Sequence, residues 1–306
     1  MNKSFTLIEI LVVIVVIGVL SAFILVGMSS ITDSANIAKG KAFLNSMDNS
    51  LLLGRVSQWK LDDRTTVAPF TTSDAWGTNT GTLTDSSGAC SFVVPLKCPQ
   101  LVISGCPSSN CFSFEGTNDY VTFGTISSGN TLNPSTKDWT YSLWIKRGVS
   151  TDWKPVFATG PYYDYDDRMG IYSGGSYIFI SNADGTHADQ VYFYGFTNTV
   201  WQYLVMTVDR DGQTKAYLNG INVHSTATTI SDDITPNAQF YLAYKLSAYS
   251  FVDDVRVYSQ AIPTSQIQQN YFIGLNNLYK NNGIALNEFN KRVGELKNSI
   301  LAGVDN

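Results

Sequence analysis

Residues 201–220 read WQYLVMTVDRDGQTKAYLNG, and this stretch decides the fold of most of the chain. Two strand-like runs, 201–208 and 213–218, flank a DRDG segment, and Asn219-Gly220 follows the second run. Asp-Gly and Asn-Gly dipeptides beside alternating runs are strong signals for β-hairpins. The stretch therefore predicts antiparallel strands joined by tight turns.

The rest of the segment 59–258 has the same character. Residues 140–146 alternate with a period of two, as a half-buried strand does, and residues 251–258 form another strand candidate. No helical run of useful length interrupts them. Many short strands with turn residues between them favour an antiparallel β-sandwich, which we assign to residues 57–262.

Composition excludes one class of partner. Charged residues make up 15% of the 306 residues and aromatic residues 13%, which favours an extracellular β-rich module over a helical cytosolic enzyme. The net charge is −5, and no cluster of Lys and Arg lies in the middle of the chain. Because phosphate binding needs a concentrated basic face, we expect no nucleic-acid partner.

A series of short landmarks covers about two-thirds of the chain. In sequence order these are segments 59–63, 74–83, 112–121, 201–209, 217–220 and 253–258. Together they resemble the laminin G-like, concanavalin A-type jelly roll of bacterial surface proteins. The resemblance implies a module that binds a surface glycan or a protein and does not itself imply catalysis.

The N-terminal segment predicts a single-pass membrane protein. Residues 10–28 carry no charged side chain, and a run of about this length lets a helix cross the hydrocarbon core and contact membrane lipid. Lys3 favours a cytoplasmic N-terminus, with the head extracytoplasmic, on the cell surface or a pilus. Apolar residues continue at helical spacing without a Pro to residue 53, which predicts a long α-helix whose second part, 29–56, is a projecting rod.

Glu9 interrupts the apolar character of this segment, and an intramembrane acid is a functional candidate because burying it is costly. The run 3–13, KSFTLIEILVV, resembles the class III signal of type IV prepilins and type II secretion pseudopilins. The resemblance implies that a prepilin peptidase cuts between Ser4 and Phe5 and methylates the new amine. It also implies that Glu9 neutralises the amine of a neighbouring pilin-like subunit. Ser4 stands where the family usually has Gly.

Two other interpretations of this segment are an ordinary signal anchor and a cleavable secretory signal peptide. A secretory peptide needs a small-x-small site, which Gly27-Met28-Ser29 fits loosely. Neither explains FTLIEI beside so short a leader. We therefore predict a leader at 1–4 and a transmembrane helix at 5–28.

The four cysteines lie close together in a segment that reads as a loop. They are Cys90, Cys98, Cys106 and Cys111, and none is in the C-x₂-C spacing of a zinc site. This pattern predicts two disulfides outside the cytoplasm. The sequence allows three pairings, of which the most local joins Cys90 to Cys98 and Cys106 to Cys111.

Candidate catalytic residues are scarce, and we expect no enzyme and no required cofactor. A glycoside hydrolase needs two carboxylates flanking the scissile bond, yet Glu115 is the one Glu between residues 10 and 287, and no E-x-D-x-E motif occurs. The only histidines, His187 and His224, are too few and too far apart in sequence to suggest a zinc site.

Calcium is the most plausible ion, since it takes oxygen ligands and laminin G-like domains often hold one at a loop edge. The candidate ligands, on segments that such folds bring together, are Asp62, Asp63, Asn118, Asp119 and Asp253. The alternative is that these residues cap turns, or that Asp253 pairs with Arg256 or a buried hydroxyl. A second candidate is the loop 161–168, whose Tyr162, Tyr163 and Tyr165 are candidates for stacking on sugar rings, unless they pack on the sandwich.

The C-terminal segment 263–306 predicts a helical hairpin. A helix starts after Pro263, and apolar residues recur at helical spacing up to a break at 281–283 and again over 287–301. Such helices bury their apolar stripe on the sandwich or on the rod.

Taken together, the sequence predicts a pilin-like, membrane-anchored surface subunit with a lectin-like adhesion head. Because a bulky head would crowd a fibre, we expect a minor or tip pilin. The alternatives are an anchored carbohydrate-binding protein that does not polymerise, and a pseudopilin of a secretion or DNA-uptake system.

Overall fold

The fold is known from a computed structural model. The residues it describes are 54–85, 88–90, 98–115, 119–149, 154–159, 169–174, 177–183, 188–235, 238–244, 246 and 249–304. The chain divides into two compact units, residues 1–53 and 54–306. The predicted leader, the transmembrane helix and the rod up to residue 53 lie outside the described residues. Within the described part, neither of the two helices combines the length and the apolar character needed to cross a membrane.

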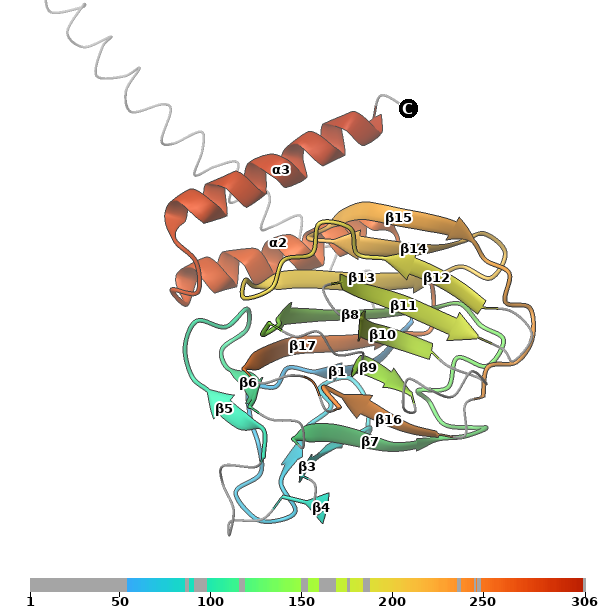
Figure 1. The fold of residues 1–306 in the computed structure, drawn as a ribbon, viewed down its shortest axis with the longest axis vertical. Helices are drawn as coiled ribbons and strands as arrows, with labels where there is room; N and C mark the ends of the chain where they lie inside the picture. The colour runs from blue at the N-terminus through green and yellow to red at the C-terminus, as the bar shows by residue number, and fades with distance from the viewer. Residues whose placement is uncertain are drawn as a thin grey trace, which may run out of the picture. The chain divides into compact units, whose positions relative to one another are not determined.

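Two antiparallel sheets form most of the second unit (Figure 1). The first sheet runs, in spatial order, through β15 (Ile221–Ala227), β14 (Gln213–Leu218), β13 (Gln202–Val208), β8 (Trp139–Lys146), β17 (Ser250–Tyr258), β6 (Cys111–Phe114) and β5 (Gln100–Val102), and β1 (Arg55–Trp59) also pairs with β17. The second sheet runs through β12 (Ala188–Tyr192), β11 (Tyr177–Ala183), β10 (Met169–Gly174), β9 (Lys154–Thr159), β16 (Ala238–Leu242), β7 (Tyr120–Ile126), β3 (Gly81–Asp85) and β2 (Thr71–Thr72), and β4 (Gly88–Ala89) pairs with β3. The sheets confirm the predicted sandwich, whose first strand begins inside the range assigned to the rod.

The hairpin predicted from residues 201–220 forms as expected. Strands β13 and β14 pair from Leu204 opposite Leu218 to Val208 opposite Thr214. Asn219 and Gly220 have φ of +53° and +80°, the left-handed values that a tight two-residue turn into β15 requires. Local turn chemistry therefore fixes the register of this corner of the first sheet.

Inward-facing side chains of the two sheets form one core. On β8, the odd-numbered residues from Trp139 to Ile145 point inward, and on β13 Leu204 and Met206 do the same. Phe157 and Phe240 of the second sheet pack in the same core, and the centroids of these two rings lie 4.4 Å from each other. This alternation is the period of two that the sequence shows.

The prediction that residues 140–146 form a half-buried strand is wrong, because both faces of β8 are buried. The outward-facing Trp144 lies under α2 (Thr264–Lys280) and stacks on Tyr271, with the ring centroids 5.6 Å apart. Covering by a helix from the far end of the chain explains why a period-two strand is buried throughout.

The C-terminal helical hairpin is present as predicted. After α2, the chain turns at Asn282, whose φ is +59°, and α3 (Leu286–Val304) follows. Arg292 of α3 donates hydrogen bonds to Glu288 at 2.7 Å and to the backbone oxygen of Trp201 at 2.6 Å. The pair of helices forms a layer over the first sheet (Figure 1).

Candidate ligand-binding site

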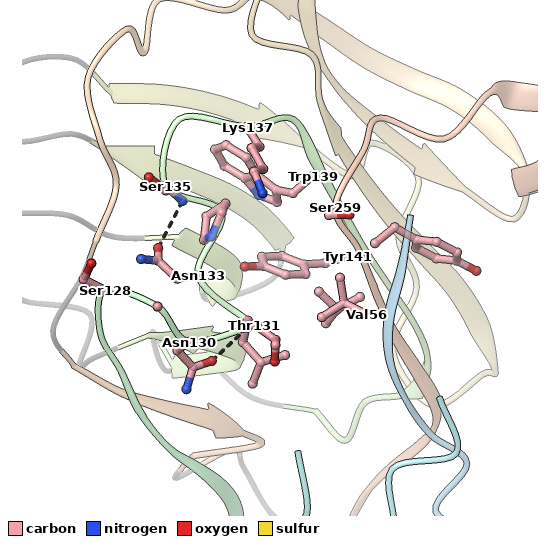
Figure 2. Close-up of a pocket in the computed structure, with 15 residues that line it drawn as sticks. Val56, Ser128, Asn130, Thr131, Asn133, Ser135, Lys137, Trp139, Tyr141 and Ser259 are labelled. Carbon is pink, nitrogen blue, oxygen red and sulfur yellow. Dashed lines mark hydrogen bonds between the residues drawn. The ribbon is translucent and has the colours of Figure 1, made fainter. Parts of the chain in front are cut away.

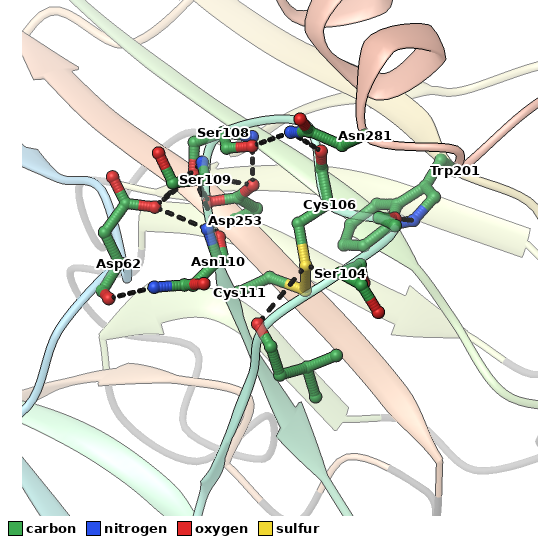
Figure 3. Close-up of a disulfide and its surroundings, with 12 residues drawn as sticks. Asp62, Ser104, Cys106, Ser108, Ser109, Asn110, Cys111, Trp201, Asp253 and Asn281 are labelled. Atoms are coloured by element: carbon green, nitrogen blue, oxygen red, sulfur yellow. Dashed lines mark hydrogen bonds between the residues drawn. A yellow bond between two sulfur atoms is a disulfide. The ribbon is translucent and has the colours of Figure 1, made fainter.

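Two disulfides brace the loops at one end of the sandwich. Cys90 is joined to Cys98 and Cys106 to Cys111, which is the most local of the three pairings that the sequence allows. No free cysteine occurs among the described residues. Figure 3 shows the second disulfide beside a dense group of hydrogen bonds.

The loop closed by Cys106 and Cys111 is held by a buried carboxylate. Asp253 of β17 accepts hydrogen bonds from the backbone N–H of Ser108 at 2.7 Å and from its hydroxyl at 2.8 Å (Figure 3). Burial raises the pKa of Asp253 well above its ordinary value, and the neighbouring Asp254 raises it further. The hydrogen bonds from Ser108 lower this pKa but do not cancel the effect of burial. Asn281 of the α2 C-terminus donates to the backbone oxygen of Cys106 at 3.0 Å. The carboxylate thus connects the central strand β17 to the disulfide loop.

The described candidates for calcium ligands act as hydrogen-bond acceptors within the chain, and a calcium site at these residues stays a prediction. Asp62 accepts hydrogen bonds from the backbone N–H groups of Ser109 and Asn110 and from the hydroxyl of Ser108, the residue that Asp253 also binds. The other candidates are engaged elsewhere: Asp63 accepts from the Ser73 hydroxyl and Asp119 from the Glu115 N–H. In the described ranges, no group of three or more His, Cys, Asp or Glu side chains could hold a metal ion. Asp62, Asp63 and Asp119 thus each order a neighbouring segment through hydrogen bonds to it.

Two predicted candidates cannot be placed. Asn118 and the tyrosine loop with Tyr162, Tyr163 and Tyr165 lie outside the described residues.

Asp254, rather than Asp253, forms the ion pair with Arg256, at 2.7 Å, and it also accepts a hydrogen bond from Gln58 at 2.6 Å. Asp253 pairs with a hydroxyl, which is the alternative weighed from the sequence.

A pocket of about 370 Å³ opens beside the loop 127–138 between β7 and β8 (Figure 2). We call it the β7–β8 pocket. This volume lies at the small end of the range for small-molecule sites. Its apolar wall comes from several elements: Val56, Leu132, Pro134, Trp139, Tyr141 and Val257. Its polar wall is mostly the loop itself: Ser128, Asn130, Thr131, Asn133, Ser135 and Lys137, with Ser259 after β17.

Side-chain hydrogen bonds fix the shape of this loop. Asn130 Oδ1 accepts from the N–H of Leu132 at 2.8 Å, and Asn133 Oδ1 accepts from the N–H of Ser135 at 3.0 Å (Figure 2). Asn133 also donates to the hydroxyl of Thr235 at 2.9 Å. Because Asn side chains that bond the backbone two residues on stabilise turns, the pocket wall is formed before any ligand enters.

Several polar groups of the pocket have no partner within the described part of the chain. These are the ammonium of Lys137, the Nδ2 of Asn130 and the buried Nε1–H of Trp139. The Nε1 atom of Trp139 has almost no accessible surface, so the donors that face the opening are those of Lys137 and Asn130. None of the described lining residues is Asp or Glu. The pocket thus offers donors and a cation around an apolar base.

Sequence reasoning did not find this pocket. Its loop reads SSGNTLNPSTK over residues 127–137, a clear turn signal that predicts a loop and says nothing about a cavity. The aromatic base comes from β8, and Val56 and Ser259 come from opposite ends of the domain sequence. A pairing of distant segments of this kind leaves no local pattern to detect.

The comparisons with known proteins agree with the fold. Residues 115–268, half of the chain, match the family model of the concanavalin A-like lectin/glucanases superfamily, and the chain belongs to this superfamily. Residues 1–25 match the prokaryotic N-terminal methylation motif. The suspected fusion of a pilin-type N-terminus with a laminin G-like domain is therefore confirmed. No curated protein sequence matches the chain.

Solved structures show the same fold at low identity. The binding domain of Paraclostridial Mosquitocidal Protein 1 is 15% identical, with a TM-score of 0.52 over 73% of this chain and 53% of that one. The binding domain of botulinum neurotoxin serotype D is 12% identical, with a TM-score of 0.55 over 72% and 51%. This chain thus spans about half the length of either domain.

A third structure is matched almost completely. Domain 4 of an extracellular GH43 arabinanase from Geobacillus stearothermophilus, in complex with arabinotriose, is 18% identical, with a TM-score of 0.52 over 71% of this chain and 98% of that domain. At these identities the three likenesses establish the shared fold alone.

Proposed function

We propose that this protein is a pilin-like, membrane-anchored surface subunit whose lectin-like head binds a glycan or a protein ligand. One observation carries the proposal: a single chain joins an N-terminal methylation motif at residues 1–25 to a concanavalin A-like domain at residues 115–268. The first supplies anchoring and assembly, and the second supplies a ligand surface. The head lies outside the cytoplasm, where its two disulfides are stable.

The N-terminal motif supports processing and assembly. Prepilin peptidase cuts between Ser4 and Phe5, and the new N-terminal amine of one subunit pairs with Glu9 of the next. Opposite charges about 4 Å apart attract by about 1 kcal/mol in water and several times more in a medium of low dielectric constant. This difference makes Glu9 a device for assembly inside the membrane, with other pilin-like subunits as partners.

The head is a binding module rather than an enzyme. Its relatives by fold include domains named for binding, among them an arabinotriose complex. The carboxylate Asp253 is buried and engaged with Ser108, and Asp254 pairs with Arg256, so neither is available as an exposed acid or base. A jelly-roll glycosidase would need two such groups facing its cleft.

The size of the head favours a minor or tip subunit. More than 200 residues form the second unit, and such a mass on every subunit would crowd a helical fibre. A subunit at the tip would present the β7–β8 pocket without that constraint.

The test is to replace Glu9 with Leu in the native host and to compare it with Glu9→Asp as a matched control. We expect Glu9→Leu to abolish pull-down of partner subunits, while Glu9→Asp retains part of it. If Glu9→Leu leaves pull-down and surface display unchanged, the protein is an anchored binding protein that does not polymerise. Co-purification with a secretion or DNA-uptake machinery instead of a surface fibre would identify a pseudopilin.

A further inference from the structure

The chemistry of the β7–β8 pocket carries an inference that rests on the proposed function. We propose that this pocket binds an acidic sugar residue of a surface glycan, with the ammonium of Lys137 facing the carboxylate of the sugar. The inference names both a site and a ligand class for the head.

The charge of the pocket is positive although the chain as a whole is acidic. The chain has 25 acidic and 20 basic residues, yet the described residues that line this pocket include a Lys and no acid. Lys137 is exposed and forms no ion pair in the described ranges. A cation that no protein acid neutralises, in a pocket without carboxylates, favours an anionic ligand.

Two acids close to the lining residues accept hydrogen bonds from other groups. Asp138 accepts a hydrogen bond from the N–H of Arg210 at 2.8 Å, and Asp233 accepts from the Ser135 hydroxyl at 3.0 Å. The guanidinium carbon of Arg210 lies 5.3 Å from the ring centroid of Trp139, so a second cation lies against the base of the pocket. These groups explain why the loop is stable without a carboxylate in the pocket wall.

The shape and the polarity of the pocket suit a single sugar ring. A pyranose ring has apolar C–H faces and a periphery of hydroxyl groups. The pocket combines an apolar wall, in which Trp139 and Tyr141 are each 1% exposed, with hydroxyl and amide groups of the loop (Figure 2). Its volume of about 370 Å³ suits one ring rather than an extended chain. A free phosphate would leave the apolar base uncovered, and a neutral sugar would leave Lys137 without a partner.

The loop also offers donors to a ligand in the pocket. Asn130 Nδ2 has no acceptor within the described residues and can donate to a ligand oxygen, as can the ammonium of Lys137. Hydroxyl and carboxylate oxygens of an acidic sugar are such acceptors. A well-placed donor set with one cation gives both orientation and selectivity for the charged ligand.

The test uses the full chain in detergent and four separate probes: glucuronic acid, N-acetylneuraminic acid, glucose and galactose. Isothermal titration measures each affinity at low and at high salt. We expect at least one acidic sugar to bind about fivefold or more tightly than either neutral sugar, and its affinity to fall with salt. We expect Lys137→Gln to weaken that binding about five- to tenfold. Lys137→Arg should retain most of it, because the charge is kept.

The matched control is Lys215→Gln, which makes the same charge change on β14 at a residue that does not line the pocket. It should leave every affinity unchanged. Equal binding of neutral and acidic sugars, no effect of Lys137→Gln, or no binding of any of the four sugars would each overturn the inference. In the first two cases the head still binds sugar, so the proposed function survives. In the third case the inference fails, and the proposed function is judged separately by the Glu9→Leu experiment.

Discussion

Gly274 of α2 lies directly on the indole of Trp144 of β8. A Cβ at position 274 would lie 2.5 Å from Nε1 and 2.6 Å from two ring carbons of Trp144. Only glycine lets the helix approach this closely, and the approach buries Trp144 completely. The contact attaches the C-terminal helical hairpin to the middle of the first sheet.

We expect Gly274→Ala to destabilise the protein, because α2 must move away from Trp144. Overpacking of this kind costs about 1–3 kcal/mol in the free energy of unfolding. Gly294→Ala in α3 is the control, since a Cβ there meets nothing within 4 Å and alanine favours a helix by about 0.5–1 kcal/mol. Denaturant unfolding of both variants should give shifts of opposite sign. Equal shifts would show that the contact with Trp144 is unimportant.

We expect loss of the Cys106–Cys111 disulfide to destabilise the loop that holds Ser108. The double variant Cys106→Ser with Cys111→Ser should lower the free energy of unfolding by about 2 kcal/mol, from the loop entropy of a short closed segment. Hydrogen exchange should also show faster exchange of the Ser108 N–H, whose acceptor is Asp253. Slow exchange of that N–H in the variant would mean that the carboxylate alone orders the loop.

Asp253 should make stability depend on pH in the direction set by its raised pKa. A carboxyl whose pKa is higher in the folded than in the unfolded state stabilises the fold most below the unfolded pKa of about 4. This contribution is lost as pH rises through the folded pKa.

We therefore expect Asp253→Asn, which can still accept the Ser108 N–H, to gain stability relative to the wild type as pH rises above about 4. The slope is at most about 1.4 kcal/mol per pH unit, measured by denaturant unfolding from acid to neutral pH. Parallel stability curves for the two proteins would contradict the raised pKa.

Arg292 should anchor α3 more strongly than its exposed neighbour Lys291. Its side chain is 7% exposed, and Arg292→Met leaves the backbone oxygen of Trp201 without that donor, at a cost of about 1–3 kcal/mol. Lys291 is 66% exposed, and its Nζ lies 3.9 Å from Oε1 of Glu295. Because such exposed pairs contribute little, Lys291→Met should change the free energy of unfolding by less than about 0.5 kcal/mol.

The contribution of the Arg292–Glu288 ion pair to stability should depend on pH. The hydrogen bond from Arg292 lowers the pKa of Glu288, so this part of the stability is present above the unfolded pKa of Glu288 and is lost as pH falls through the folded one. The penalty for Arg292→Met should therefore shrink in acid. A penalty that is independent of pH would assign the effect to Trp201 alone.

Local chemistry explains which parts of the fold could be predicted. The Asn219-Gly220 turn and the break after α2 at Asn282 depend on backbone preferences that the sequence states directly. The burial of Trp144 depends on α2, which lies far along the chain, so the alternation of β8 could not reveal it.

The surroundings of the candidate residues could not be predicted from local patterns. The disulfide loop brings the N–H groups of Ser109 and Asn110 to the carboxylate of Asp62, a contact between segments that are far apart in sequence. The β7–β8 pocket combines Val56 with Trp139, which are distant in sequence and meet only after the sheets pack.

The central claim is that this chain enters the prepilin pathway, and the intact mass of the protein purified from its native host tests it most directly. We predict a mass that lacks Met1 to Ser4 and carries one additional methyl group on the amine of Phe5. A mass that still includes Met1 to Ser4, without the methyl group, would contradict the claim and leave a tethered lectin-like domain.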